Sequence, residues 1–174
     1  MDTHGLLMVF TGNGKGKTTA ALGMAMRSAG HGLGVCIIQF IKGSWSYGEL
    51  KAVKRFSDNI DFRVMGRGFT WKSDNLEEDK RLALEGWTLA RECIDSGKYH
   101  LVILDEFTYL LHYKMLDLDV CLDVFSNRSP SQHVLVTGRY APDALVELAD
   151  LVTEMQVVKH PLQKGIKAQR GIEF

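Results

Sequence analysis

The stretch Thr11-Gly12-Asn13-Gly14-Lys15-Gly16-Lys17-Thr18 decides the fold of this chain. It follows a short apolar run, Leu6 to Phe10, and precedes a segment of helical character that ends near Gly30. Glycines at such a point let the backbone curl so that several N–H groups face phosphate oxygens, and the helix start adds the positive end of its dipole. The position between a strand and a helix therefore predicts a phosphate-binding loop.

Two residues of the loop have predicted roles of their own. Lys17 would bring a mobile positive charge to the terminal phosphates, and the hydroxyl of Thr18 would ligate Mg²⁺. The usual pattern G-x-x-x-x-G-K-[ST] has glycine where this chain has Thr11. We expect Gly12 and Gly14 to supply the flexibility instead. The alternative is an ordinary glycine-rich turn that happens to contain lysines.

Two further segments support a nucleotide site. The apolar run 101–104 leads into Asp105 and Glu106, and in phosphate-loop proteins an acid at the carboxyl end of a strand reaches the magnesium ion. We therefore predict that Asp105 and Glu106 are metal ligands together with Thr18. Arg139 follows another apolar strand and is a candidate to neutralise phosphate charge, with an exposed loop arginine as the alternative.

The order of the elements predicts the fold class. Helices are expected from Lys17 to Ala29, from a capping box at Asp74 and Glu77 up to Gly97, and from Pro142 to Asp150. Residues 41–54 resemble a loop, with a short helix as the alternative. Strands are expected at residues 6–11, 35–40, 60–65, 100–105, 133–137 and 151–158. Apolar strands interleaved with helices indicate an α/β fold, a mostly parallel sheet with helices on both faces. We expect one domain, residues 1–174.

Composition excludes several classes of protein. The 174 residues include 21 Lys or Arg and 21 Asp or Glu, so a zero net charge argues against a protein that grips nucleic acid through global charge. The longest apolar run has five residues, and we expect no membrane span and no secretory leader. The three scattered cysteines indicate reduced thiols in a cytoplasmic protein, and the six histidines lack metal-ligand spacing.

The stretch from Arg63 to Lys72 is unusual because it interleaves basic residues with Phe69 and Trp71 between glycines. Three interpretations remain open. It could stack on single-stranded nucleic acid, form an apolar wall for a large flat ligand, or fold onto the core by its aromatic side chains. The basic tail, residues 159–170, is similarly ambiguous.

Taken together, these residues resemble the ATP:corrinoid adenosyltransferases of the phosphate-loop type. The resemblance covers nearly the whole chain. It rests on the phosphate loop and on the motifs Gln39-Phe-Ile-Lys-Gly43, Gly68-Phe-Thr-Trp71, Leu104-Asp-Glu106, Thr137-Gly-Arg139, Glu147-Leu-Ala-Asp150, Val158-Lys-His160 and Gly165-Ile-Lys-Ala-Gln169.

The resemblance implies a RecA-type fold, a homodimer, and ATP with Mg²⁺ in the loop. It implies that Arg27 contacts the nucleotide, and that Phe69 and Trp71 press on the lower face of the corrinoid and displace its lower axial ligand. Members of the family often carry an N-terminal extension that covers the corrinoid, whereas here we expect the first strand near Leu6 and no such segment. The implied triphosphate ligands are Gly12, Asn13, Gly14, Lys15, Gly16, Lys17, Thr18 and Thr19, with Arg139 as a further candidate.

The implied reaction is the transfer of the 5′-deoxyadenosyl group of ATP to the cobalt of cob(I)alamin or a related corrinoid, with release of triphosphate. Cobalt(I) is itself a strong nucleophile, which agrees with the lack of a Ser-His-Asp or Cys-His arrangement in the sequence. An electron-donating reductase or flavodoxin is an implied partner. Two other hypotheses remain: a RecA-type ATP-hydrolysing motor, with Glu106 orienting water, and an RNA-binding module that uses the stretch from Arg63 to Lys72.

Overall fold

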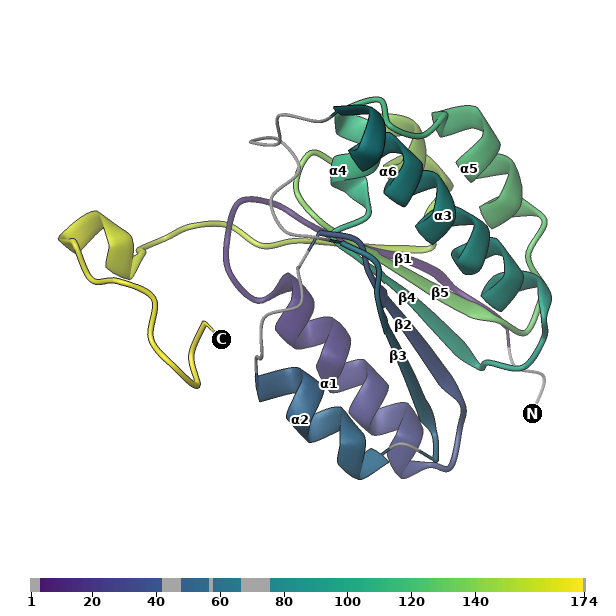
Figure 1. The fold of residues 1–174 in the computed structure, drawn as a ribbon, viewed down its shortest axis with the longest axis horizontal. Helices are drawn as coiled ribbons and strands as arrows, with labels where there is room; N and C mark the ends of the chain where they lie inside the picture. Colours follow the sequence, from purple (N-terminus) through teal and green to yellow (C-terminus); the bar gives the residue numbers. More distant parts are fainter. Residues whose placement is uncertain (1–3, 42–47, 57, 67–75, 174) are drawn as a thin grey trace.

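Parallel strands form a single sheet in the order β3-β2-β4-β5-β1-β6 (Figure 1). The computed structural model describes residues 4–41, 48–56, 58–66 and 76–173. The four inner strands, β1, β2, β4 and β5, are short and apolar, and most of their residues are buried, as expected for strands covered on both faces. In β3, at one edge of the sheet, only Ile60 is buried. The strands are β1 (Leu7–Thr11), β2 (Val35–Gln39), β3 (Ile60–Val64), β4 (Leu101–Asp105), β5 (His133–Thr137) and β6 (Leu151–Glu154).

Helices cover both faces of this sheet. In Figure 1, α1 and α2 lie below it, and α3, α4, α5 and α6 lie above it. This arrangement confirms the predicted fold class, and every strand pair in the described sheet is parallel. The α-helices are α1 (Lys17–Gly30), α2 (Gly48–Val53), α3 (Leu76–Asp95), α4 (Thr108–His112), α5 (Leu118–Ser126) and α6 (Asp143–Leu148). Short 3₁₀-helices are η1 (Lys54–Phe56) and η3 (Pro161–Lys164).

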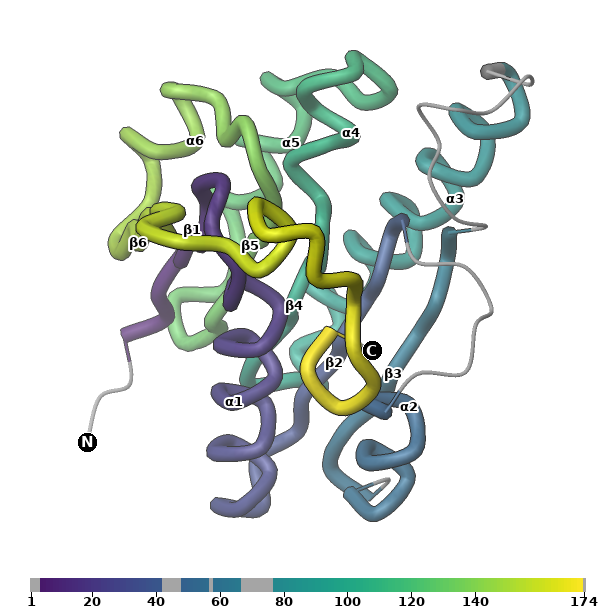
Figure 2. Tube along the Cα trace, turned by 90° about the vertical axis from the view of Figure 1, so that its left-hand side faces the viewer, coloured from purple at the N-terminus to yellow at the C-terminus, as the bar shows by residue number. Residues whose placement is uncertain are grey.

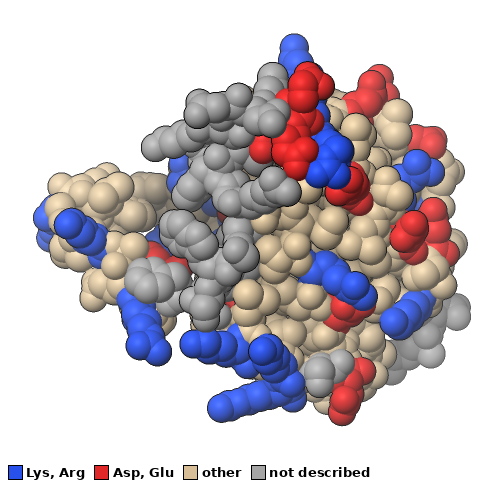
Figure 3. Space-filling model, in the orientation of Figure 1, with Lys and Arg blue, Asp and Glu red and all other residues tan. Residues whose placement is uncertain are grey.

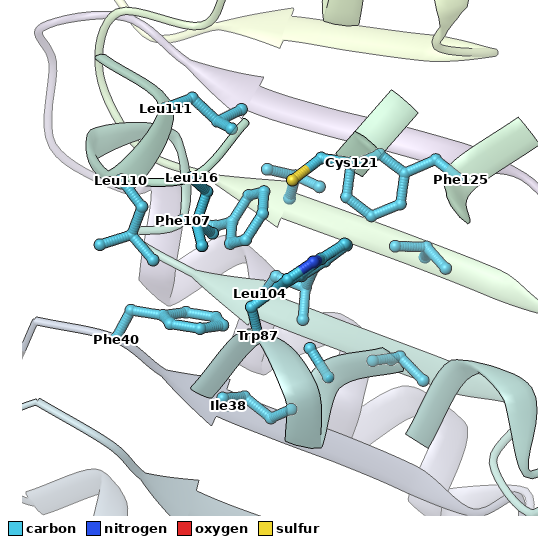
Figure 4. Packing of buried hydrophobic residues seen from close by; sticks show 14 of the residues in the cluster. Ile38, Phe40, Trp87, Leu104, Phe107, Leu110, Leu111, Leu116, Cys121 and Phe125 are labelled. Carbon is cyan, nitrogen blue, oxygen red and sulfur yellow. The ribbon is translucent and has the colours of Figure 1, made fainter. Parts of the chain in front are cut away.

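The core beneath α3 and α5 is built around aromatic rings. Phe107 lies at its centre, with ring centroids 5.2 Å from Phe40, 5.3 Å from Trp87 and 6.0 Å from Phe125 (Figure 4). A second core, between α1 and the sheet, is filled by smaller side chains such as Ala21. The buried residues Ala21, Ala25 and Ala29 let α1 lie close to the sheet, and α1 begins at the phosphate loop.

The element boundaries follow the sequence predictions closely. The strand predicted at 151–158 ends at Glu154, and the helix predicted at 142–150 is shorter in the structure, Asp143–Leu148. The segment 41–54 contains the short helix α2. The helices α4 and α5 were not predicted. The proposed cap Asp74 lies outside the described residues.

The C-terminal tail, residues 155–173, leaves the sheet after β6 and projects beyond the edge where the strands end (Figures 1 and 2). It contains η3, where the side chains and backbones of His160 and Gln163 cap one another. On the face drawn in Figure 3, the acidic and basic side chains of the described residues are interspersed. None of the helices in the described ranges combines the length and the apolar character that a membrane crossing needs.

Candidate nucleotide site

The phosphate loop is folded around its own lysine. Lys17 Nζ donates hydrogen bonds to the carbonyl oxygens of Gly12 and Gly14, both at 2.8 Å, and the lysine is only 7% exposed. Burial lowers the pKa of Lys17, with Arg139 also lowering it and the charges of Glu106 and Asp105 acting in the opposite direction. The buried ammonium group of Lys17 is well suited to exchange these two neutral carbonyls for phosphate oxygens, because a nearby anion would stabilise its positive charge.

Met155 braces the loop from the start of the tail. Its N–H donates to the carbonyl of Thr11 at 2.9 Å, and its carbonyl accepts from the N–H of Gly14 at 2.6 Å. The chain approaches so closely that a Cβ on Gly14 would lie 2.7 Å from the Met155 oxygen. Gly12 has the same constraint, at 2.5 Å, and its φ of 93° also favours glycine. Gly12 and Gly14 are therefore needed for the close approach of the loop to residue 155.

Asp105 is the centre of a buried hydrogen-bond network beneath the loop. Its Oδ1 accepts hydrogen bonds from the hydroxyls of Thr18 and Thr137, both at 2.8 Å, and its Oδ2 accepts one from Gln39 Nε2 at 2.9 Å. Asp105 is 1% exposed, so these three donors are what stabilises its charge away from water. The network connects the start of α1 with the ends of β2, β4 and β5.

The chain turns sharply after β4 and after β5. Glu106 has a φ of 62°, and its N–H donates to the hydroxyl of Thr137 at 2.9 Å. Gly138 has a φ of 138°, and a Cβ there would lie 2.1 Å from the hydroxyl oxygen of Thr108. That hydroxyl donates to the carbonyl of Arg139 at 2.5 Å. These contacts bind the two turns together at the carboxyl edge of the sheet.

The resulting cleft has a volume of about 860 Å³. Its floor is residues 13–19, and its walls are further residues of α1 and α2 together with Glu106, Tyr109 and Arg139. The tail closes part of the rim through His160 and residues 171–173. Lys15 Nζ lies 3.6 Å from a carboxylate oxygen of Glu173. The cleft therefore presents basic, hydroxyl and carboxylate side chains around the start of α1: Lys15, Lys17 and Arg139, Thr18 and Thr19, and Glu49, Glu106 and Glu173.

Most of the predicted site residues come together here. Residues 13–19, Glu106 and Arg139 line the cleft, and Asp105 lies directly behind Thr18. Arg27 lies in the last turn of α1, about 15 Å along the helix axis from Lys17, and is not among the described residues that line the cleft. Phe69 and Trp71 fall outside the described residues.

Four positions that the sequence analysis did not assign to the site also shape it: Gln39, Thr108, Thr137 and Met155. A sequence pattern does point to two of them. β2 and β5 each end in a single polar residue after an apolar run, Gln39 and Thr137, as β4 ends in Asp105. Because parallel strands end at the same edge, those polar groups meet. Nothing in the sequence marks Met155, whose contribution is made by its backbone.

The donor set suits a hard cation that arrives with phosphates. Thr18 and Glu106 provide a hydroxyl and a carboxylate that line the cleft, and the Asp105 carboxylate lies directly behind Thr18. Within the described part of the chain, no group of three or more His, Cys, Asp or Glu side chains is arranged to hold a metal by itself. Mg²⁺ typically keeps one or two protein carboxylates and completes its shell with phosphate oxygens and water.

Solved structures confirm the RecA-like fold. The flagellar accessory protein FlaH from Methanocaldococcus jannaschii superimposes with a TM-score of 0.62 at 12% identity, covering 87% of this chain and 71% of that one. The RadB recombinase gives a TM-score of 0.51 at 16% identity, covering 91% of this chain and 77% of that one. At these identities the likeness concerns the fold alone.

Relatives in sequence are much closer. A corrinoid adenosyltransferase of Pseudomonas aeruginosa is 44% identical, and one of Escherichia coli K12 is 42% identical, each over 99% of this chain and 85% and 87% of the relative. The corrinoid adenosyltransferase CobA of Salmonella typhimurium is 40% identical over the same share of this chain and 87% of its own. The family model described as ATP:corrinoid adenosyltransferase BtuR/CobO/CobP matches residues 3–174. With this match along the chain and a phosphate-loop cleft at its centre, the chain belongs to the ATP:corrinoid adenosyltransferase family.

Proposed function

We propose that this enzyme transfers the 5′-deoxyadenosyl group of ATP to the cobalt of cob(I)alamin or a related reduced corrinoid. The observation that carries the proposal is the family match over residues 3–174, joined to a cleft built on the phosphate loop. The lone pair of cobalt(I) attacks C5′ of ATP, the cobalt–carbon bond forms, and the C5′–oxygen bond breaks. Triphosphate leaves with the electron pair of that bond.

The protein contributes placement and charge. No proton has to be removed from the nucleophile, so no general base is required, and the cofactor-like substrate provides the reactive centre. The leaving group develops negative charge, which Lys17, Arg139 and the N–H groups of residues 12–19 would stabilise. Holding C5′ in line with cobalt adds a proximity effect that can reach ~7–11 kcal/mol when alignment is good.

Of the three predicted metal ligands, Thr18 and Glu106 would hold Mg²⁺ on the triphosphate side of the cleft, and Asp105 would act from behind Thr18. When bound, it neutralises phosphate charge and so favours departure of the triphosphate. In the free protein, the hydrogen bond from Thr18 to Asp105 at 2.8 Å holds this hydroxyl beside the carboxylate. The role of Asp105 is to orient Thr18 from behind, whereas Glu106 faces the cleft itself.

Family membership supports three further assignments. Phe69 and Trp71 are proposed to occupy the space beneath the corrin and exclude the lower axial ligand, so that cobalt(II) accepts an electron more readily. The electron would come from a reductase or a flavodoxin. Arg27 is proposed as a nucleotide contact. Losing Phe69 or Trp71 should depress the assay that starts from cobalt(II) more than the assay that starts from cobalt(I).

We propose a single-domain homodimer that works in the cytoplasm, where ATP is available. The tail carries apolar side chains that no other part of the described chain covers: Val158 is 88% exposed, Leu162 is 69% exposed and Ile172 is 67% exposed. Exposed apolar groups in one segment favour contact with a second copy of the chain. Sedimentation at two protein concentrations tests the dimer.

The reaction itself is tested under anaerobic conditions. Chemically reduced cob(I)alamin, MgATP and protein should give a light-sensitive alkylcobalt product and one triphosphate per corrinoid, with no ADP. The matched variants are Lys17→Ala, which should lose activity, and Lys98→Ala, an exposed lysine on the opposite edge of the sheet, which should keep it. Release of ADP and inorganic phosphate, with no alkylcobalt product, would instead favour the ATP-hydrolysing motor.

A further inference from the structure

Two of the three cysteines meet in the core between the sheet and α3. Cys36 lies in β2 and Cys93 lies near the end of α3, and their sulfur atoms are 3.3 Å apart. Both are free thiols, and their exposed fractions are 0% and 7%. A disulfide bond joins sulfur atoms at about 2.05 Å, so these two need to approach each other by only about 1.3 Å. The two thiols are therefore placed for an intramolecular disulfide.

A charged cluster at the protein surface adjoins the sulfur atoms. Asp61 of β3 is the register partner of Cys36, so the two side chains lie side by side on the same face of the sheet. The Asp61 carboxylate accepts two hydrogen bonds from Arg63, both at 2.7 Å, and one from the Tyr99 hydroxyl at 2.8 Å. The Arg63 side chain is 52% exposed. The cysteine pair thus lies close to solvent, beside a polar group rather than deep in an apolar core.

The two thiols of the pair differ in reactivity. The hydrogen bond from Cys36 lowers the pKa of the Cys93 thiol, and Arg63 lowers it as well, while burial acts in the opposite direction. The same hydrogen bond and burial raise the pKa of Cys36. Because the thiolate is the nucleophilic form, Cys93 is the thiol that reacts first with an oxidant. The third cysteine, Cys121, is fully buried in α5, and burial raises its pKa to about 12.

We propose that Cys36 and Cys93 form a reversible disulfide when the protein meets hydrogen peroxide. The Cys93 thiolate attacks one peroxide oxygen, becomes a sulfenic acid and releases hydroxide, which takes up the proton that Cys93 lost. The Cys36 sulfur then attacks the Cys93 sulfur, and the sulfenic oxygen leaves as water with the Cys36 proton. Two electrons pass from the two sulfurs to the peroxide, and the products are one disulfide and two molecules of water. A dithiol reductant reverses the reaction by thiol–disulfide exchange.

The disulfide would fasten β2 to α3 without disturbing the nucleotide site. Its ends are 57 residues apart in sequence, and the segment between them contains α2 and β3. Closing such a segment restricts the unfolded chain and so stabilises the folded one. Cys36 faces the core under α3, whereas Gln39 lies on the opposite face of β2, where it donates to Asp105. Neither sulfur belongs to the described residues that line the cleft.

Thiol titration of the full-length protein tests this site. After treatment of the native, reduced protein with hydrogen peroxide, the number of titratable thiols should fall from three to one. Mass spectrometry of the digested protein should find a peptide pair joined through Cys36 and Cys93, formed within one chain. Dithiothreitol should restore the three thiols. Oxidised glutathione should react at least about tenfold more slowly, because a bulky disulfide has poor access to sulfurs that are 7% exposed or less.

The disulfide form should also differ from the reduced protein in stability. It should melt about 5 °C or more above the reduced form, while its MgATP affinity, measured by calorimetry, changes by less than about twofold. In Cys36→Ala, Cys93 lacks its partner, so its sulfenic acid should accumulate and be trapped by dimedone. Cys121→Ala is the matched control, a buried cysteine outside the pair, and should form the disulfide as the wild type does. Thermal melts of both variants before oxidation show whether each is folded.

Three results would overturn the assignment. The first is a native wild-type protein that keeps three thiols in excess peroxide, or that reacts only after denaturation in urea. The second is a cross-link through Cys121 or between two chains. The third is a Cys36–Cys93 disulfide form that melts no higher than the reduced protein. The wild-type measurements decide all three, so the proposal remains testable if Cys36→Ala does not fold.

Discussion

Replacing Thr137 by Val keeps the side-chain shape and removes a hydroxyl that makes two hydrogen bonds. The hydroxyl donates to Asp105 at 2.8 Å and accepts from the N–H of Glu106 at 2.9 Å, and Thr137 is fully buried. A hydrogen bond to a charged group contributes about 1.5–3 kcal/mol, and a neutral one about 1 kcal/mol. Thr137→Val should therefore lower the free energy of unfolding by about 3 kcal/mol.

The control is Thr137→Ser, which keeps the hydroxyl and loses a methyl group, at a cost of about 1 kcal/mol. Urea denaturation followed by circular dichroism gives both values, provided the slope of the transition is the same in the two variants. The reasoning would be refuted by Thr137→Val being no less stable than Thr137→Ser. In that case the Asp105 charge would be stabilised without Thr137.

Three further predictions concern other parts of the molecule. Gly14→Ala should lower stability by about 1–3 kcal/mol and weaken ATP binding, measured by melting and calorimetry, since its Cβ would lie 2.7 Å from the Met155 carbonyl. Burial lowers the pKa of His133 below its ordinary 6.5, so on acidification the unfolded chain takes up the proton before the folded chain does. The free energy of unfolding, measured by urea denaturation at a series of pH values, should therefore fall as the pH drops below about 6.5. The variant His133→Gln should show a smaller fall over this pH range. Glu173→Gln should leave the melting temperature unchanged and tighten ATP binding by less than about fivefold at low salt. The reason is that the Glu173 carboxylate no longer competes with phosphate for Lys15. An equal tightening at high salt would contradict this explanation.

The sequence predicts the sheet and the phosphate loop well because both depend on local patterns. Short apolar runs that end in glycine or a polar residue define the strands, and the glycine-lysine-threonine order defines the loop. Helix α5 has a local sequence pattern: Asp117 caps it by accepting from the N–H of Val120, and Cys121 and Phe125 face the core one turn apart. Helix α4 has only five residues, and tertiary packing around Phe107 accounts for it better than any local preference.

The site is less accessible to sequence reasoning where it depends on backbone contacts between distant segments. The brace from Met155 to Gly14 joins residues from opposite ends of the chain through main-chain atoms, which carry no sequence pattern. The left-handed turns at Glu106 and Tyr140 are similarly hidden, since neither residue type favours a positive φ. Arg27 shows a different limit, because the family resemblance implies that it contacts the nucleotide, whereas the sequence gives no distance from it to the cleft.

The brace at Met155 has a consequence for biosynthesis. The phosphate loop is synthesised before β2, β3, β4 and β5, whereas the segment that fixes its curvature follows all six strands. A nascent chain that has completed β5 contains every residue of the nucleotide loop and still lacks the contact that shapes it. The growing polypeptide should thus gain its ATP affinity in one late step, when β6 pairs with β1 and brings Met155 against the loop.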